Sequence, residues 1–87
     1  MKSYLITFRS ITYGQRAEQT LRALGKKSRL RRTPRWMEDR GCGYALEVTT
    51  GEVSELLAVL RQQQIPWRKV WLARPGGEME ELSNVLP

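Results

Sequence analysis

The fold is decided by residues 44–60, which read YALEVTTGEVSELLAVL. In the first part, Tyr44, Leu46 and Val48 alternate with Ala45 and Glu47, a pattern that predicts a half-buried strand. The second part has the spacing of a helix with one apolar face, formed by Val53, Leu56, Leu57 and Leu60. A capping-box pattern separates the two parts, formed by Thr49 and Glu52. The stretch therefore predicts a strand and a helix that share a core.

The residues before this stretch predict a strand, a helix and a weaker strand. Residues 4–8 alternate as a strand. Thr12 and Gln15 form another capping-box pattern, and Gly25 is typical of a helix end. Residues 27–32 predict only a weak strand, because Leu30 is their one large apolar residue. The apolar face expected for the intervening helix consists of Tyr13, Ala17, Leu21 and Leu24.

Residues 67–73 predict a further strand, which completes the order βαββαβ. Two helices can cover only one face of a sheet of this size. The sequence therefore predicts an α+β fold, a ferredoxin-like βαββαβ sandwich with a four-stranded antiparallel sheet and both helices on one face. The residues expected in its core are Leu46, Val48, Leu56, Leu60 and Val70.

The length of 87 residues fits a single domain. Because Pro75-Gly76-Gly77 breaks the pattern, we expect the ferredoxin-like domain in residues 1–74 and an acidic tail in residues 75–87. The tail could form a short helix with one apolar face, made of Met79, Leu82, Val85 and Leu86.

The composition excludes several kinds of site. The chain has no histidine and a single cysteine, Cys42, which excludes Ser-His-Asp hydrolysis, an internal disulfide and a multi-cysteine zinc site. We therefore expect neither a metal nor a cofactor. No apolar run approaches the roughly 18 residues of a membrane span, and the apolar start is too short for a signal peptide. We expect a cytoplasmic protein with no membrane partner.

Positive charge is concentrated in residues 26–40. The chain has 15 Lys and Arg against 9 Asp and Glu, a net charge of +6. Such a basic segment either binds a polyanion, such as nucleic acid, or protects an exposed edge strand from pairing with another chain. Along its predicted strand, Trp71 points to the opposite side from Val70 and Leu72. It is therefore expected on the open face of the sheet, the face that no helix covers, where it could stack on a base or pack in a homodimer. The candidate binding residues are Lys27, Arg29, Arg31, Arg32 and Trp71.

Cys42 is the one side chain with an evident covalent role. Gly41 and Gly43 flank it and leave its sulfur sterically open, and the nearby cations Arg40 and Arg35 favour the nucleophilic thiolate. Without a histidine base, such a thiolate suits sulfur or selenium transfer, or the formation of a mixed disulfide, better than hydrolysis. The alternative is that Cys42 is a small apolar filler at the start of a strand.

An RNA-recognition motif has the same element order. Its third strand begins basic-Gly-aromatic-Gly-aromatic, and Arg40-Gly41-Cys42-Gly43-Tyr44 matches except at Cys42. In that motif the residue at Tyr44 faces the open side, which would expose Leu46 and bury Glu47 without a partner. The alternation therefore favours Tyr44 facing inward. Nucleic-acid binding through the basic segment and Trp71 remains an alternative function.

Four segments together resemble the selenium/sulfur carrier-like family, over about residues 3–73. These are the opening strand 4–8, the helix with Arg16-Ala17-Glu18 and Leu24-Gly25, the segment 31–35, and Cys42-Gly43-Tyr44-Ala45-Leu46. The last two resemble the family's Pro-Thr-Pro-Arg segment and its Cys-Gly-hydrophobic-Ala-Leu signature.

The resemblance implies a small carrier, rather than an enzyme, whose Cys42 holds sulfur or selenium as a persulfide or selenopersulfide. Donor and acceptor proteins would be its partners. The chain departs from the family in having Glu38-Asp39-Arg40-Gly41 where small residues usually precede the cysteine. Its second strand is also more basic than the family's, which favours an adaptation for binding polyanions.

Overall fold

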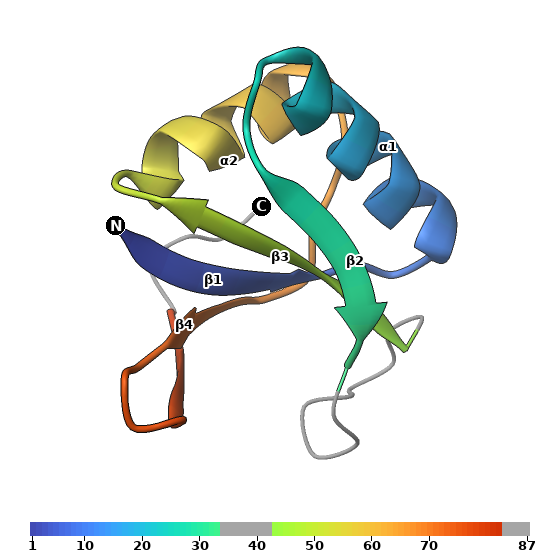
Figure 1. The fold of residues 1–87 in the computed structure, drawn as a ribbon. Helices are drawn as coiled ribbons and strands as arrows, with labels where there is room; N and C mark the ends of the chain where they lie inside the picture. The colour runs from blue at the N-terminus through green and yellow to red at the C-terminus, as the bar shows by residue number, and fades with distance from the viewer. Residues whose placement is uncertain (34–42, 83–87) are drawn as a thin grey trace.

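The computed structural model describes residues 1–33 and 43–82 and shows one antiparallel sheet with two helices on the same face (Figure 1). The strand order across the sheet is β2-β3-β1-β4-β5. The elements are β1 (Lys2–Thr7), α1 (Ile11–Ala23), β2 (Ser28–Arg32), β3 (Tyr44–Thr50), α2 (Val53–Gln62), β4 (Val70–Ala73) and β5 (Met79–Glu81).

The predicted α+β class, with two helices and an antiparallel sheet, is confirmed, but the predicted number of four strands is wrong. The fifth strand arises because Pro75-Gly76-Gly77 forms a hairpin turn and does not end the fold. Gly77 donates its N–H to the Arg74 carbonyl at 2.9 Å and has a φ of +88°, which favours glycine. Arg74 donates to the Glu78 carbonyl at 2.8 Å and closes the hairpin.

Residues 79–81, assigned from the sequence to a tail that could be helical, therefore form a strand paired with β4. Leu82 continues the pairing by donating its N–H to the Val70 carbonyl at 2.9 Å, and its side chain packs against the core. Residues 83–87 lie outside the described part of the chain. The proposed division at residue 75 stays a prediction, tested below by truncation.

The N-cap of helix α1 lies two residues before the predicted cap. It is Ser10, whose Oγ accepts the Tyr13 N–H at 3.4 Å, and not Thr12. The predicted end at Gly25 is confirmed: with a φ of +75°, Gly25 donates to the Arg22 carbonyl while Lys26 donates to the Leu21 carbonyl. These two bonds are the Schellman arrangement, which satisfies carbonyls left open at a helix end.

Helix α2 begins after an N-cap at Glu52, and the predicted cap at Thr49 is wrong. Instead, the Oγ1 of Thr50 accepts the Glu52 N–H at 3.2 Å and shapes the turn from β3 into the helix. The helix ends in a second Schellman arrangement, in which Gln64 and Ile65 donate to the carbonyls of Arg61 and Leu60. Gln64 there has a φ of +59°, an unfavourable value for a residue with a side chain.

The core lies between the sheet and the helices. All five residues predicted for it are buried, none of them more than 3% exposed. Leu24, expected on the inner face of α1, is 54% exposed because it forms the C-cap, beyond the last helical turn. Gly14 lets α1 approach the sheet closely, since a Cβ there would lie 3.0 Å from Cδ2 of Leu30.

Candidate functional site

The three residues proposed for thiol chemistry, Cys42, Arg40 and Arg35, lie outside the described residues. The structure does describe the two ends of the segment that carries them. Thr33 donates its N–H to the Gly43 carbonyl at 3.0 Å, so the chain leaves β2 and enters β3 at neighbouring points. Gly43 has a φ of +83°, a conformation that favours glycine, and this accounts for the glycine bonded directly to Cys42.

Tyr44, the next residue, is half-buried, and Leu46 and Val48 on the same face of β3 are buried beneath the helices. The prediction that Tyr44 and its neighbours on this face point inward, toward the helices, is therefore confirmed. The guanidinium of Arg32 lies over the Tyr44 ring, 5.5 Å from its centroid. Because Tyr44 is on the helix side, the open face lacks the aromatic side chain that an RNA-recognition motif uses at this position.

The open face of the sheet carries a small apolar cluster, separate from the main core. Leu5 and Ala45 are its buried members, and Trp71 and Met79 pack against them. Trp71 therefore lies on the open face, as its parity predicts. The register places Trp71 opposite Leu5, and Leu5 opposite Glu47.

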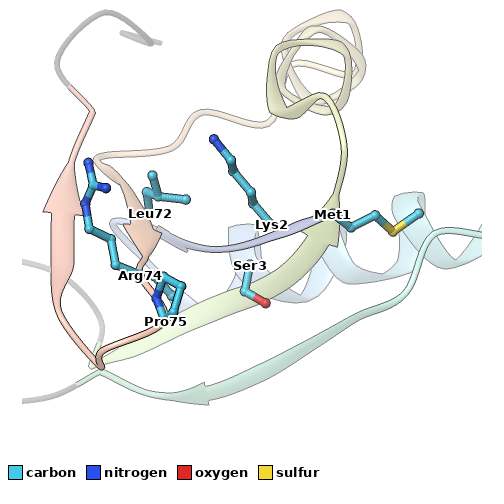
Figure 2. Close-up of a pocket in the computed structure, with 7 residues that line it drawn as sticks. Met1, Lys2, Ser3, Leu72, Arg74 and Pro75 are labelled. Carbon is cyan, nitrogen blue, oxygen red and sulfur yellow. The ribbon is translucent and has the colours of Figure 1, made fainter.

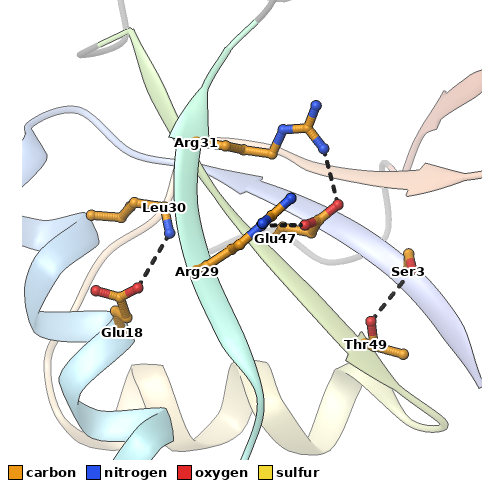
Figure 3. Close-up of polar contacts among 7 residues, drawn as sticks. All are labelled: Ser3, Glu18, Arg29, Leu30, Arg31, Glu47 and Thr49. Atoms are coloured by element: carbon orange, nitrogen blue, oxygen red, sulfur yellow. Dashed lines mark hydrogen bonds and ion pairs between the residues drawn. The ribbon is translucent and has the colours of Figure 1, made fainter.

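Two of the candidate basic residues meet at a single carboxylate on this open face (Figure 3). Glu47 accepts a hydrogen bond from the Nε of Arg29 at 3.1 Å and another from the Nη1 of Arg31 at 3.0 Å. Glu47 thus finds two cationic partners on the open face, which explains why the sequence can place a carboxylate there. Lys27 and Arg29 line a shallow pocket of about 170 Å³ beside Glu47.

The candidate binding residues do not form one surface. Arg32 alternates with Arg31 and lies on the helix face, while Arg29 and Arg31 lie on the open face. Trp71 shares the open face but is separated from β2 by β3 and β1. Three strand spacings amount to about 14 Å between the backbones of Arg29 and Trp71.

A side chain that the sequence did not indicate occupies part of the exposed edge of β2. Glu18 of α1 reaches over the strand, and its Oε2 accepts the Leu30 N–H at 3.3 Å (Figure 3). An edge N–H bonded in this way is unavailable for pairing with another strand. Glu18 also forms an ion pair at 3.6 Å with Arg22, one helical turn further on. The sequence shows that spacing but gives no signal for the contact with Leu30.

A pocket of about 390 Å³ lies where β1 begins and β4 ends (Figure 2). Lys2 and Leu72 project there on the side of the sheet that carries α2 (Figure 2). Arg74, at the rim, forms an ion pair with Glu80. Because β3 runs antiparallel to β1, this pocket is at the opposite end of the sheet from Gly43. The sequence analysis did not identify it.

Two smaller pockets lie at the other end, and Trp67 lines both of them. One, of about 280 Å³, is lined by Arg61, Gln64, Ile65, Pro66 and Trp67. The other, of about 110 Å³, is lined by Arg9, Tyr13, Pro66, Trp67 and Arg68. Trp67 is only 3% exposed and the Arg61 guanidinium lies 5.4 Å from its ring centroid. Trp67 is therefore a core tryptophan.

Residues 1–33 and 43–82 contain neither a cluster of metal ligands nor a helix that could span a membrane. The glutamates of this part of the chain form no group of three that could hold a metal ion. No helix in this part of the chain has the length and apolar character needed to cross a membrane.

Residues 3–72 match the sequence model of the family described as "Putative Se/S carrier protein-like". The match covers most of the 87 residues, and the chain belongs to this family. The resemblance drawn from the four sequence segments is therefore confirmed. Neither the curated proteins nor the solved structures gave a match.

Proposed function

We propose that this protein is a thiol carrier that holds sulfur or selenium on Cys42 as a persulfide or selenopersulfide. The observation that carries the proposal is the family membership over residues 3–72, a range that contains the single cysteine of the chain. The description of the family names a carrier of these elements. Persulfide chemistry on Cys42 is the step that the proposal adds.

The chemistry required of Cys42 is limited. A thiolate accepts a sulfur atom from a donor persulfide, which leaves as a thiolate, and a second thiolate later attacks the terminal sulfur and regenerates the Cys42 thiolate. Each step exchanges one sulfur–sulfur bond for another, so no outside oxidant or reductant is needed. We expect donor and acceptor proteins to supply the two thiols, and we propose that the exchange occurs in the cytosol, where thiols remain reduced.

Two features of the chain support this role. Arg35 and Arg40 lie near Cys42 in sequence, and we propose that their charge lowers the pKa of the thiol below its ordinary value. Gly43 follows Cys42 with a positive φ, so the residue next to the sulfur has no side chain to hinder an approaching thiol.

The rate at which native protein reacts with a small alkylating agent, measured against pH, tests these requirements. We expect Cys42 to react in the folded state, with an apparent pKa below that of an ordinary cysteine, and Arg40→Gln to raise that pKa. Cys42→Ser provides the control and should lose all labelling without unfolding. A thiol that reacts only after denaturant is added is buried filler, and that result would refute the carrier function.

We also propose that β1 to β4 with the two helices form a ferredoxin-like unit to which β5 is added. The order β2-β3-β1-β4 among these strands supports the assignment. Truncation before β5, described below, tests whether this unit folds alone.

A second proposed function is weak binding of nucleic acid by the open face. The observation that favours it is the placement of Arg29 and Arg31 on the same face as Trp71. The shared partner Glu47 opposes this binding, because it neutralises part of the charge of both arginines. Self-association through Trp71 is the competing use of the same face, and sedimentation of the wild type beside Trp71→Ala distinguishes the two.

A further inference from the structure

We propose that the pocket of about 110 Å³ between Arg9, Tyr13 and Arg68 binds a small tetrahedral oxyanion. Its five lining residues include two arginines and no acidic residue. Arginine presents its donors in a fork that matches the oxygens of such an anion. The arginine side chains at this pocket are thus suited to a ligand with two or more oxygens.

The size of the pocket limits the ligand. One water molecule takes roughly 30 Å³ in the liquid, so the pocket holds several waters or one compact ion. Sites for drug-sized ligands and cofactors usually measure about 300–1,000 Å³. A nucleotide is therefore too large, whereas phosphate, sulfate and thiosulfate are of suitable size.

The backbones that carry the two arginines are held together by hydrogen bonds through Thr7. Arg68 donates its N–H to the Thr7 carbonyl at 2.8 Å, and Thr7 donates its own N–H to the Lys69 carbonyl at 2.9 Å. The Thr7 Oγ1 also accepts the Lys69 N–H at 3.0 Å. Because Thr7 is 7% exposed, these bonds are shielded from water and fix Arg68 beside the end of β1, two residues before Arg9.

The local electrostatics add to the positive charge of the Arg9 guanidinium. Tyr13 is in the first turn of α1, and that turn contains no acidic residue. The amino end of a helix carries partial positive charge, and no acidic side chain of this turn offsets it. Among the residues that the structure describes, no carboxylate forms an ion pair with Arg9.

The position of the pocket relates it to the proposed carrier function. Thr7 pairs with Ala45 near the start of β3, so Arg9 and Gly43 lie toward the same end of the sheet. Gly43 is bonded to Cys42. An oxyanion held by Arg9 and Arg68 would therefore bind at the end of the domain where the thiol-bearing segment joins the sheet. Binding itself needs no contribution from Cys42.

The test is a titration of ¹⁵N-labelled full-length protein with phosphate, sulfate or thiosulfate at constant ionic strength, followed by amide shifts. We expect saturable shifts centred on Arg9, Tyr13 and Arg68. Arg9→Gln and Arg68→Gln should each weaken binding by roughly tenfold, the usual effect of losing one charge-assisted hydrogen bond. Arg9→Lys should restore only part of the affinity, because it keeps the charge without the fork.

Arg22→Gln is the matched control, since it removes one exposed arginine of α1 away from the pocket. It should leave the affinity unchanged. Equal losses in Arg22→Gln and Arg9→Gln, or shifts that spread over all basic residues without saturation, would overturn the proposal. Preference for thiosulfate would identify a sulfur-bearing oxyanion as the ligand, and equal binding of all three would identify a general tetrahedral-anion site.

A Cys42→Ser variant separates this proposal from the carrier function. It should bind the oxyanion as the wild type does while taking up no sulfur. If the wild type binds the anion but accepts no persulfide, only the carrier proposal fails. If it accepts persulfide but binds no anion at the pocket, only the oxyanion site fails.

Discussion

Glu47 of β3 lies directly opposite Arg29 of β2 and accepts a hydrogen bond from its Nε at 3.1 Å. The second oxygen of the same carboxylate is bonded to Arg31. Glu47 therefore joins two strands on the open face and at the same time reduces the positive charge that this face presents. Both effects can be measured through one substitution.

Replacing Glu47 by Gln should increase nucleic-acid binding at little cost in stability. The Glu47 side chain is 30% exposed and that of Arg29 is 73% exposed, so solvent screens the pair, and we expect a loss of less than about 1 kcal/mol on unfolding in urea. Released from the carboxylate, Arg29 and Arg31 should bind phosphate groups more strongly in fluorescence anisotropy with labelled single-stranded RNA.

Glu55→Gln is the control for this substitution, because it makes the same change of charge on an exposed residue of α2. It should raise RNA binding less than Glu47→Gln does. Equal increases in the two variants would mean that net charge alone governs binding and that the open face has no special part in it.

The two faces of β2 should contribute unequally to polyanion binding. We expect the double variant Arg29→Gln, Arg31→Gln to lower both the affinity for RNA and its dependence on salt concentration, because both side chains lie on the open face. Arg32 lies on the helix side, over Tyr44. Arg32→Gln should therefore have a smaller effect than Arg29→Gln or Arg31→Gln alone. The measurement is the slope of log affinity against log salt for each variant, and an equal slope for all of them would contradict a role of the open face.

Gln64 offers a way to stabilise the protein. Its φ of +59° is unfavourable for a residue with a side chain. The corresponding position at the end of α1, Gly25, is already a glycine. Gln64→Gly should therefore raise the free energy of unfolding by about 0.5–1 kcal/mol. Gln63→Gly is the matched control, since Gln63 has a φ of −87° and gains nothing from glycine. Chemical denaturation of both variants checks the prediction, and destabilisation by Gln64→Gly would refute it.

Deletion of residues 76–87 should leave a folded but less stable domain. The truncation removes β5 and exposes the edge of β4, and it also removes Leu82 from the core. We expect a cooperative thermal transition at a lower temperature, measured by circular dichroism, because the helices and the other strands are retained. Loss of the cooperative transition would show that the hairpin of β4 and β5 is essential for folding.

The core could be predicted from the sequence because burial follows parity and helical spacing. Leu46, Val48 and Leu60 each belong to a pattern with a single apolar face, so only one orientation buries them. The helix caps were less predictable. Ser10 and Thr12 are both suitable caps, and the choice between them depends on where β1 ends.

The hairpin was missed because Pro75-Gly76-Gly77 is compatible both with a chain break and with a tight turn. The pairing of Met79 with Ala73 decides between them, and that contact is not visible in the local pattern. The contact from Glu18 to Leu30 is similarly tertiary: it depends on how α1 crosses the sheet. The thiol-bearing residues Cys42, Arg40 and Arg35 lie outside the described residues, so their predicted roles remain for experiment.

The carrier function is tested most directly by intact-protein mass spectrometry after incubation with a small persulfide donor, without reductant. The account predicts one added sulfur on folded wild-type protein, assigned to Cys42 by fragmentation and removed by a second thiol. Cys42→Ser should gain none. Folded protein that gains no sulfur, while the same protein gains it in denaturant, would contradict the account.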